Sequence, residues 1–479
     1  MLSYKRTVSQ KTQRVLKIIT NKNLFAFLTF FYLYCISAVE VYAVTHTAAS
    51  CSRADVSSAI TAALTGDTVL VPAGAATWSS GITITKGINL IGSGIGNTII
   101  TAPAGAITYS PSNYSLNTPF RLSGFTFSLG GSGTGTLVNI GRNPSSPYHP
   151  GPTQTKIRVD HNRFTNGPAG NTSAHALHIY GAMYGVADNN TFDTIFYPVK
   201  HDPALSGGCC GGQWSWDNWS LTFGAADDNF YMEDNTFSLP AYGGESILND
   251  CQYSGRYAYR YNTITQAGGG NAMLDMHGNQ GGGVGDANAM WSCFGGELYG
   301  NQINTGGHGG RFLNQRGGEV LSFFNNFNGG GMSFDITEEH ADSEEPTTNP
   351  EPQHVHNSYY WNNRVNISGS LISLGVTTRI GGVPNANQDF WTDITGSGVS
   401  CGTLANRPST CTAGQGYWAT EQSCTDLTGM VGVDPTTPIS GTLYKCTATN
   451  TWTEFYTPLE YPHPLTLSKP NPPTGVRIE

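Results

Sequence analysis

The chain has 479 residues and a formal net charge of −9, and charged residues make up only 12% of it. Soluble domains usually contain about 25% charged residues, so neutral polar groups and the 60 glycines must supply much of the surface and the turns. The acidic balance excludes nucleic acid as an expected partner, because binding the phosphate backbone requires clustered basic side chains.

Residues 1–43 have the pattern of a secretory signal peptide. Six basic residues precede an apolar run over 24–39, and the small Ala43 offers a cleavage point. A membrane span needs about 20 apolar residues, and this run is shorter. We therefore predict cleavage after Ala43, a location outside the cell or at its surface, and no membrane span in the mature chain. An uncleaved membrane anchor is the alternative.

Residues 44–387 are predicted to form the main domain. Its opening, over 59–100, combines a short helix with apolar strands that are separated by Gly-Asp, Pro-Ala-Gly and Lys-Gly turns. This opening resembles the cap and first coils of the pectate-lyase-like superfamily of right-handed parallel β-helix proteins. The resemblance implies an all-β solenoid whose N-terminal helix covers the open apolar end of the coil.

An internal repeat supports the same fold. Each repeat contains Asn, one variable residue, and then Phe, Ile or Val, and successive asparagines are 24 to 45 residues apart. We expect the asparagines to form one column at a bend, where Asn tolerates a left-handed backbone, and the apolar partners to stack inside. A β-sandwich or a β-propeller explains the regular asparagines less well. The repeats are DHNRF at Asn162, DNNTF at Asn190, EDNTF at Asn235, RYNTI at Asn262, YGNQI at Asn301, FNNF at Asn325 and WNNRV at Asn363.

Residues 388–479 are predicted to form a Cys-bearing segment with a Pro-rich tail, packed against the coil. Nine of the 10 cysteines follow the predicted leader, as expected in an oxidising compartment. Sequence proximity favours the disulfides Cys401–Cys411 and Cys424–Cys446, and neighbouring coils favour Cys251–Cys293. The odd number leaves one cysteine unpaired among Cys51, Cys209 and Cys210.

Three insertions lengthen the repeats, between Asn190 and Asn235, between Asn262 and Asn301, and between Asn325 and Asn363. If the coils are in register, these loops leave from a similar side and wall a groove that suits a polysaccharide. The first insertion carries three tryptophans whose rings suit stacking on sugars, or equally packing of the loop onto the coil. These tryptophans are Trp214, Trp216 and Trp219.

Ionisable residues in successive coils are the candidates for catalysis. The segments around them, YMEDNTF, GRYAYRYNTI, MHGN, GELYGN and NQRGGE, are similar to a group of bacterial extracellular β-helix proteins without an established reaction. In pectate lyases, Asp and Glu bind calcium and an Arg removes the C5 proton of the uronate. That resemblance implies Arg256 or Arg316 as the base, with His277 as the alternative, and calcium ligands at Asp250, Asp275 and Glu297. The arginine signature of pectate lyases is absent, and structural ion pairs are the competing interpretation.

The predicted function is that of a polysaccharide lyase acting on a uronic-acid polymer outside the cell. A polygalacturonase-like hydrolase is a further alternative, because the chain contains Asp227-Asp228 and His277-Gly278, but it lacks the Asn-Thr-Asp and Arg-Ile-Lys motifs of that class. The third interpretation is a structural, matrix or adhesive protein that uses the coil as a rod. An enzyme requires basic and acidic side chains that converge in a cleft, whereas a rod requires only flat polar faces.

Overall fold

The computed structural model divides into two units, Met1–Ala43 and Val44–Glu479, and the second contains the described fold. The structure describes residues 43–113, 116–130, 135–141, 154–166, 174–181, 183–202, 223–225, 229–241, 246–252, 255–269, 272–278, 292–339, 354–380, 383–394 and 398–467. The predicted leader lies outside these residues, apart from Ala43. No helix within the described ranges is long and apolar enough to cross a membrane.

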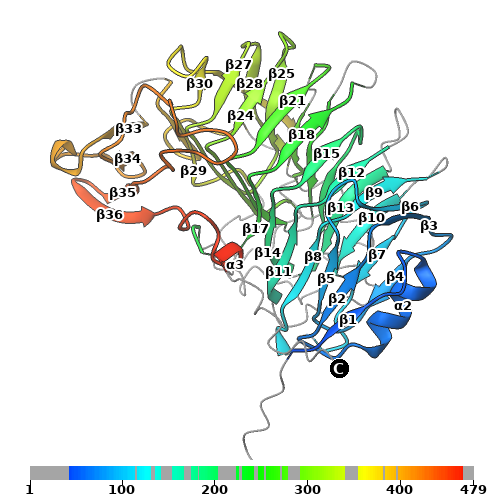
Figure 1. Cartoon of the computed structure of the whole chain (residues 1–479). Helices are drawn as coiled ribbons and strands as arrows, with labels where there is room; N and C mark the ends of the chain where they lie inside the picture. Colours follow the sequence, from blue (N-terminus) through cyan, green and yellow to red (C-terminus); the bar gives the residue numbers. More distant parts are fainter. Residues whose placement is uncertain are drawn as a thin grey trace, which may run out of the picture. The chain divides into compact units, whose positions relative to one another are not determined.

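The second unit is built around a right-handed parallel β-helix, as predicted (Figure 1). Each coil contributes one strand to each of three parallel sheets, which we name A, B and C in the order in which the chain visits them.

Sheet A contains β1 (Thr45–Thr47), β2 (Thr68–Val71), β5 (Asn89–Gly92), β8 (Phe120–Ser123), β11 (Gln154–Asp160), β14 (Met183–Asp188), β17 (Phe230–Glu233), β20 (Arg256–Arg260), β23 (Gly295–Tyr299), β26 (Glu319–Phe323), β29 (Ser358–Trp361) and β32 (Phe390–Thr392). Sheet B contains β3 (Gly74–Thr77), β6 (Thr98–Ala102), β9 (Thr126–Leu129), β12 (Arg163–Thr165), β15 (Thr191–Asp193), β18 (Thr236–Leu239), β21 (Thr263–Gln266), β24 (Gln302–Asn304), β27 (Asn326–Asn328) and β30 (Arg364–Val365). Sheet C contains β4 (Ile82–Ile84), β7 (Ile107–Tyr109), β10 (Gly135–Ile140), β13 (Ala174–Tyr180), β16 (Val199–Asp202), β19 (Asn249–Cys251), β22 (Leu274–Met276), β25 (Gly310–Gln315), β28 (Met332–Glu339) and β31 (Ser373–Ile380). Because β32 belongs to sheet A, the coil continues past the predicted boundary at residue 387.

The apolar partner of each repeat forms the predicted interior stack in sheet B. Phe164 and Phe192 have ring centroids 5.0 Å apart, and Phe192 and Phe237 are separated by 4.6 Å. The register continues through Ile264, and these four side chains are at most 1% exposed. Burying one such side chain contributes about 1.5–3 kcal/mol, so the repeated apolar position supplies a large part of the core.

The seven repeat asparagines form one buried column, which we call the asparagine ladder. The backbone N–H of each Asn donates to the side-chain Oδ1 of the next, at 3.0 Å from Asn162 to Asn190 and 2.9 Å from Asn190 to Asn235. The same pattern continues as far as Asn363. Each side chain therefore satisfies buried backbone groups that the bend removes from the strand ladders.

The sequence predicts a left-handed backbone at the ladder asparagine itself. That prediction is wrong, because the residue before each ladder asparagine has the positive φ. Five of these seven preceding residues are Gly, Asn, Asp or His, which tolerate a positive φ better than most residue types. The ladder asparagine itself begins the turn into sheet B. The preceding residues are His161 (φ 52°), Asn189 (54°), Asp234 (52°), Tyr261 (57°), Gly300 (66°), Phe324 (52°) and Asn362 (51°).

A helix covers the N-terminal end of the coil, as predicted. Helix α2 (Arg53–Ala62) begins at Ser52, whose side chain accepts a hydrogen bond from the Asp55 N–H. Val56 and Ile60 are its buried residues, and the helix packs against β1, β2 and β4. The apolar end of the first coils is thereby shielded from water.

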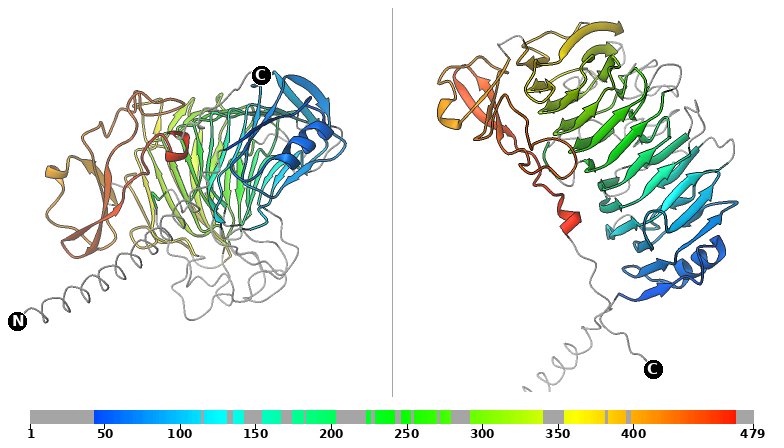
Figure 2. Two further views of the ribbon diagram at one scale, coloured as in Figure 1. Left: turned by 60° about the horizontal axis from the view of Figure 1, so that its bottom comes forward. Right: turned by 45° about the horizontal axis from the view of Figure 1, so that its top comes forward.

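The C-terminal segment packs against the outer face of sheet A (Figure 2). It contains β33 (Val399–Gly402), η4 (Leu404–Asn406), β34 (Gly416–Ala419), β35 (Thr442–Ala448), β36 (Thr451–Tyr456) and α3 (Pro464–Leu467). Trp418 of this segment packs against Phe323 and Trp361 of sheet A, with ring centroids 5.2 and 5.3 Å away. A large part of sheet A is therefore covered by the chain itself.

Three disulfides connect six of the seven described cysteines. The predicted Cys251–Cys293 bond is present, but both predicted local pairs in the C-terminal segment are wrong, because the bonds are Cys401–Cys424 and Cys411–Cys446. The chain between Cys401 and Cys411 turns away from β33, and hydrogen bonds next to Cys411 join it to β35 instead. Cys51 is free and buried. Cys209 and Cys210 lie outside the described residues.

Candidate functional site

A row of polar side chains follows sheet C along the coil. His178, Lys200, Asp250, Asp275 and Asn314 occupy equivalent positions of β13, β16, β19, β22 and β25. Successive side chains of a strand point to opposite faces, and their apolar neighbours Leu177, Val199, Leu274 and Leu313 are fully buried in the core. The row therefore lies on the outer face, with about 4.8 Å between neighbouring strands.

An imidazole and two carboxylates meet in the middle of this row. The Nε2 atom of His277 lies 2.9 Å from Oδ1 of Asp250 and 3.5 Å from Oδ2 of Asp275. Lys200 adds an ammonium 3.8 Å from Asp250. The side chains of Lys200, His277 and Asp275 are 20%, 18% and 23% exposed, so solvent and a ligand can reach them. We call Lys200, Asp250, Asp275 and His277 the sheet C cluster.

Arg316, directly after β25, holds the side chains of this cluster in place. Its Nε and Nη2 atoms donate to the two oxygens of Asp275 at 3.0 and 2.6 Å, and Nη1 donates to Glu339. Nη2 also lies 2.6 Å from Nδ1 and 2.9 Å from Nε2 of His277. The guanidinium therefore contacts the imidazole as well as Asp275. Only 4% of the Arg316 side chain is exposed, which suits a positioning residue.

The three long insertions all leave the coil at the corner beside this cluster. They follow β16, β22 and β28 of sheet C and precede β17, β23 and β29 of sheet A. This common origin agrees with the predicted exit on one side, although most residues of the insertions lie outside the described ranges. Among these are Trp214, Trp216 and Trp219, so their proposed sugar contacts stay a prediction. The Cys251–Cys293 disulfide ties the end of the second insertion to the strand that carries Asp250.

The structure brings together four of the six candidate catalytic and metal-binding residues, namely Asp250, Asp275, His277 and Arg316. Glu297 instead lies in sheet A, where it accepts hydrogen bonds from Asn229 at 2.6 Å, from the Gly224 N–H at 2.9 Å and from the Tyr456 hydroxyl at 2.7 Å. Burial raises the pKa of Glu297. Its carboxyl group thus anchors the C-terminal segment and does not join Asp250 and Asp275.

Arg256, another candidate for the base, also lies outside the sheet C cluster. It begins β20 of sheet A, is 7% exposed, and its guanidinium carbon lies 5.6 Å from the centre of the Phe294 ring. A buried cation over an aromatic ring gains electrostatic stabilisation. This environment favours a structural role for Arg256.

Two relevant residues were not among the candidates from the sequence. Lys200 supplies the cation at the edge of the sheet C cluster, and Glu339 holds Arg316 from β28. Lys200 precedes the first insertion, and Glu339 precedes the third. Their position next to an insertion in the third strand of a coil is the signal that could have identified them.

A second group of carboxylates, Asp160 and Asp188 with His161, lies in sheet A and is already neutralised. Arg121 donates to Asp160 at 2.6 Å, and Arg158 donates to Asp188 at 2.8 Å. Burial acts to raise the pKa of Asp160, but hydrogen bonds from Arg121 and His161 outweigh it and bring the pKa to about 2. These ion pairs give the group a structural role.

The predicted calcium site is only partly assembled. One oxygen or nitrogen from each of Asp250, Asp275 and His277 lies within 4.8 Å of the others. Calcium prefers six to eight oxygen ligands, whereas this group offers an imidazole and lacks Glu297. Both oxygens of Asp275 already accept hydrogen bonds from the Arg316 cation. The donor set therefore fits a resident calcium ion poorly.

The comparisons with known proteins found similar chains among solved structures alone. No protein-family model matches the chain, and no curated protein matches its sequence. Among solved structures it is similar to ORF18 of Geobacillus virus E2, with 12% identity, a TM-score of 0.29, and coverage of 69% of this chain and 58% of that chain. It is also similar to the A-modules of the mannuronan C-5 epimerases AlgE4 and AlgE6 of Azotobacter vinelandii. Each A-module is 14% identical to this chain, and each match covers 69% of this chain and 96% of the A-module. The TM-scores are 0.24 and 0.22.

The match spans less than two thirds of the Geobacillus virus protein. At these TM-scores the similarities say nothing about the reaction. The three parallel sheets establish the β-helix by themselves, and membership of the pectate-lyase-like superfamily stays a prediction.

Proposed function

We propose that this chain is an exported carbohydrate-active enzyme that cleaves a uronic-acid-containing polysaccharide by β-elimination. The observation that carries this proposal is the sheet C cluster, in which His277 lies 2.9 Å from Asp250 and within reach of Asp275, with Lys200 beside them. A proton acceptor, supporting carboxylates and a cation are the groups that such a reaction requires. The row extends along the coil, so a polymer can contact several strands at once.

In this reaction His277 is the proton acceptor. Its Nε2 faces Asp250, so the proton goes to Nδ1, and the Nη2 atom of Arg316, 2.6 Å from Nδ1, moves off that nitrogen when the polymer binds. Lys200 neutralises the carboxylate of the uronate, which makes the proton on C5 more acidic. The imidazole of His277 takes that proton, the electron pair left on C5 forms the C4–C5 double bond, and the bond from C4 to the glycosidic oxygen breaks. The imidazolium then returns the proton to the leaving oxygen. Asp250 stabilises the charged imidazole, as a carboxylate does in other acid–base dyads.

Arg316 acts in this scheme as a positioning residue and not as the base suggested by the resemblance to pectate lyases. Its guanidinium is held by Asp275 and Glu339. A guanidinium held by two carboxylates keeps its proton and is therefore a poor base. Calcium is not needed for any step, and its role in binding the polymer stays a proposal that added metal can test.

The spacing of the carboxylates supports a second candidate function. The nearest polar atoms of Asp250 and Asp275 lie within 4.8 Å, and retaining glycosidases have their two carboxyl groups about 5–5.5 Å apart. Arg316 occupies both oxygens of Asp275, however, which reduces its availability as a nucleophile. We therefore rank hydrolysis below elimination.

The test is incubation of the purified chain with polygalacturonate, alginate and a glucuronan, each with calcium and with a chelator. Elimination yields unsaturated chain ends that absorb in the ultraviolet, whereas hydrolysis yields new reducing ends without that absorbance. His277→Gln should lower the elimination rate by about 10²–10⁴-fold, the range expected for removal of a general acid–base group. His308→Gln is the matched control, because His308 lies in the turn before β25, at the opposite end of that strand from Arg316.

The outcomes separate the alternatives. Full activity of His277→Gln would remove His277 from the mechanism. New reducing ends alone would favour the hydrolase, and no product from any of the three polymers would reject the uronate lyase and favour a non-catalytic coil. Thermal unfolding of both variants must match that of the parent chain for these conclusions to hold.

A further inference from the structure

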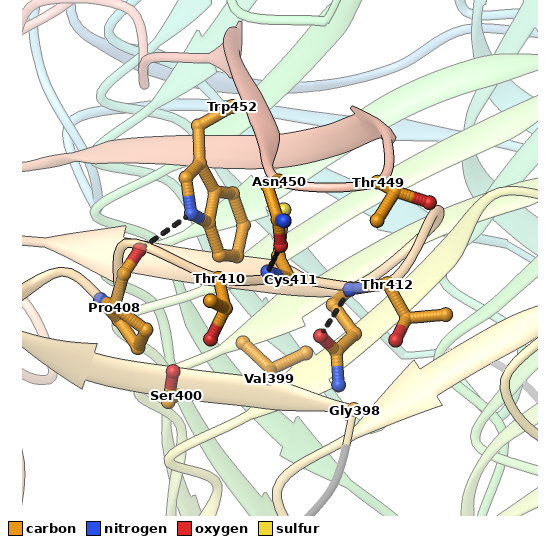
Figure 3. A pocket seen from close by; sticks show the side chains of 12 residues that line it. Gly398, Val399, Ser400, Pro408, Thr410, Cys411, Thr412, Thr449, Asn450 and Trp452 are labelled. Atoms are coloured by element: carbon orange, nitrogen blue, oxygen red, sulfur yellow. Dashed lines mark hydrogen bonds between the residues drawn. The ribbon is translucent and has the colours of Figure 1, made fainter.

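The C-terminal segment contains a pocket of about 480 Å³ that is separate from the sheet C cluster (Figure 3). It lies between β33, the chain around residues 408–415 and the β35–β36 hairpin. Six of the residues that line it define its chemistry, and they are Ser400, Pro408, Thr410, Thr412, Asn450 and Trp452. This segment packs against sheet A, so its pocket and the sheet C cluster belong to different sheets of the coil.

None of the residues that line the pocket has an ionisable side chain. Arg407, whose guanidinium carbon lies 6.0 Å from the centre of the Trp452 ring, lies closer to the Tyr444 ring, at 4.3 Å. The polar groups of the lining are hydroxyls and amides, and its one cysteine, Cys411, is in a disulfide with Cys446. Binding a phosphate or a uronate usually requires a cationic side chain or several converging N–H groups. A purely apolar ligand would leave the hydroxyls unpaired. The lining therefore suits an uncharged ligand that carries many hydroxyl groups.

Trp452 supplies the flat apolar surface of the pocket. Its indole Nε1 donates to the Pro408 carbonyl at 2.8 Å, and the ring meets Tyr417 edge-on with centroids 6.3 Å apart. Both contacts fix the ring orientation before any ligand binds. Figure 3 shows the Trp452 ring standing over the pocket, with Thr410 and Val399 on the opposite side. A pre-oriented indole is an efficient binding surface, because little side-chain entropy is lost when the ligand arrives.

Fixed polar groups surround this ring. Oδ1 of Asn450 accepts the Cys411 N–H at 3.0 Å, which leaves the amide N–H groups of Asn450 to donate to a ligand. Ser400, Thr410 and Thr412 are exposed and present hydroxyls that both donate and accept. The Cys411–Cys446 and Cys401–Cys424 disulfides stiffen the strands below them.

We propose that this pocket is a binding site for a neutral saccharide. The apolar face of a sugar ring lies against Trp452, and the sugar hydroxyls exchange hydrogen bonds with Asn450 and the Ser and Thr hydroxyls. The site holds the chain on an uncharged polysaccharide while the sheet C cluster stays free. This role is independent of the proposed reaction, because it needs neither a uronate nor His277.

The test is affinity electrophoresis of the full exported chain in gels that contain soluble xyloglucan, galactomannan or dextrin, with polygalacturonate as the charged comparison. At least one neutral polymer should retard the native chain. Trp452→Ala should raise the dissociation constant for that polymer at least 10-fold, and Trp452→Phe, which keeps a flat ring, should retain most of the affinity. Thr410→Trp should also abolish retardation, because its larger side chain fills the pocket from an exposed position.

The controls separate this proposal from the lyase. Leu404→Ala removes an exposed apolar side chain of the same segment that is 50% exposed and lies outside the pocket lining, and it should bind normally. His277→Gln should bind normally as well, even where it has lost all elimination activity. Absence of retardation by all three neutral polymers overturns the proposal. So does normal binding by folded Trp452→Ala and Thr410→Trp, whatever the outcome of the lyase assay.

Discussion

Replacing Asn235 with Ala tests the asparagine ladder at its centre. The change removes the acceptor of the Asn190 backbone N–H, at 2.9 Å, and the donor to the Ala187 carbonyl, at 2.8 Å. Both of these groups are buried and have no access to water. An unsatisfied buried group costs about 1–3 kcal/mol, so the two together should destabilise the fold by about 4 kcal/mol. The side-chain amide of Asn190 is less affected, since it still donates to the Val159 carbonyl.

Thermal and urea unfolding, followed by circular dichroism, measure this loss. The unfolding entropy is about 2.1 cal/mol/K per residue, so for a unit of this size the melting temperature should fall by about 4 °C. Asn304→Ala is the matched control, because its side chain bonds to Thr265 on the outside of the coil, and it should change stability by less than about 0.5 kcal/mol. A loss below about 1 kcal/mol for Asn235→Ala, or equal losses for both variants, would refute the reasoning that buried backbone satisfaction makes the ladder essential.

Three other predictions concern the coil and its attachments. Burial raises the pKa of Asp234 to about 7, so in the folded chain it keeps a proton that the unfolded chain releases near pH 4. Its contribution to stability therefore falls as the pH rises from about 4 to 7, and Asp234→Asn should lose less melting temperature over that range than the parent chain. Cys293→Ser removes the disulfide to Cys251 and should cost about 2–4 kcal/mol in unfolding experiments. Reductant should lower the stability of this variant by less than that of the parent chain, because only two described disulfides remain to be reduced. Arg316→Lys keeps the charge but loses the two-pronged contact with Asp275, so it should lower the elimination rate at least 10-fold, and an unchanged rate would contradict the positioning role.

The fold could be predicted because one local pattern recurs with its chemistry intact. The Asn at the bend and the apolar residue after it must satisfy the same contacts in every coil, so the sequence repeats them at Asn190 and Phe192 and again at Asn235 and Phe237. The sequence pattern places the left-handed backbone one residue too late, at the asparagine instead of at the residue before it. The pattern identifies the bend, but the side-chain hydrogen bonds of Asn do not reveal which residue has the positive φ.

The candidate site was only partly predictable, because the position of a residue within its coil decides the sheet on which it lies. Glu297 precedes Asn301 by four residues and Arg256 precedes Asn262 by six, so both belong to the strand before the bend, in sheet A. Asp250 and Asp275 follow their asparagines and lie beyond sheet B, in sheet C. Counting from each Asn would have separated the two groups.

The disulfides of the C-terminal segment show a different limit. No repeat fixes the path of the chain there, and sequence proximity was the only guide to pairing. The structure pairs Cys411 with Cys446, 35 residues away, because the segment that precedes β34 lies beside β35. Such tertiary neighbours cannot be read from local pattern alone.

The C-terminal segment returns along the coil and braces its last rungs against earlier ones. Arg260 donates to the carbonyls of Leu459 and Glu460, and α3 reaches β11 and β14, several coils earlier in the chain. A solenoid without such a brace can unzip from its last rung, since each rung touches only its neighbours. Here the final rungs cannot peel away until this brace detaches from the earlier ones. A pulling experiment on the C-terminus should therefore give a first large rupture, as the brace detaches, before the smaller steps of the rungs.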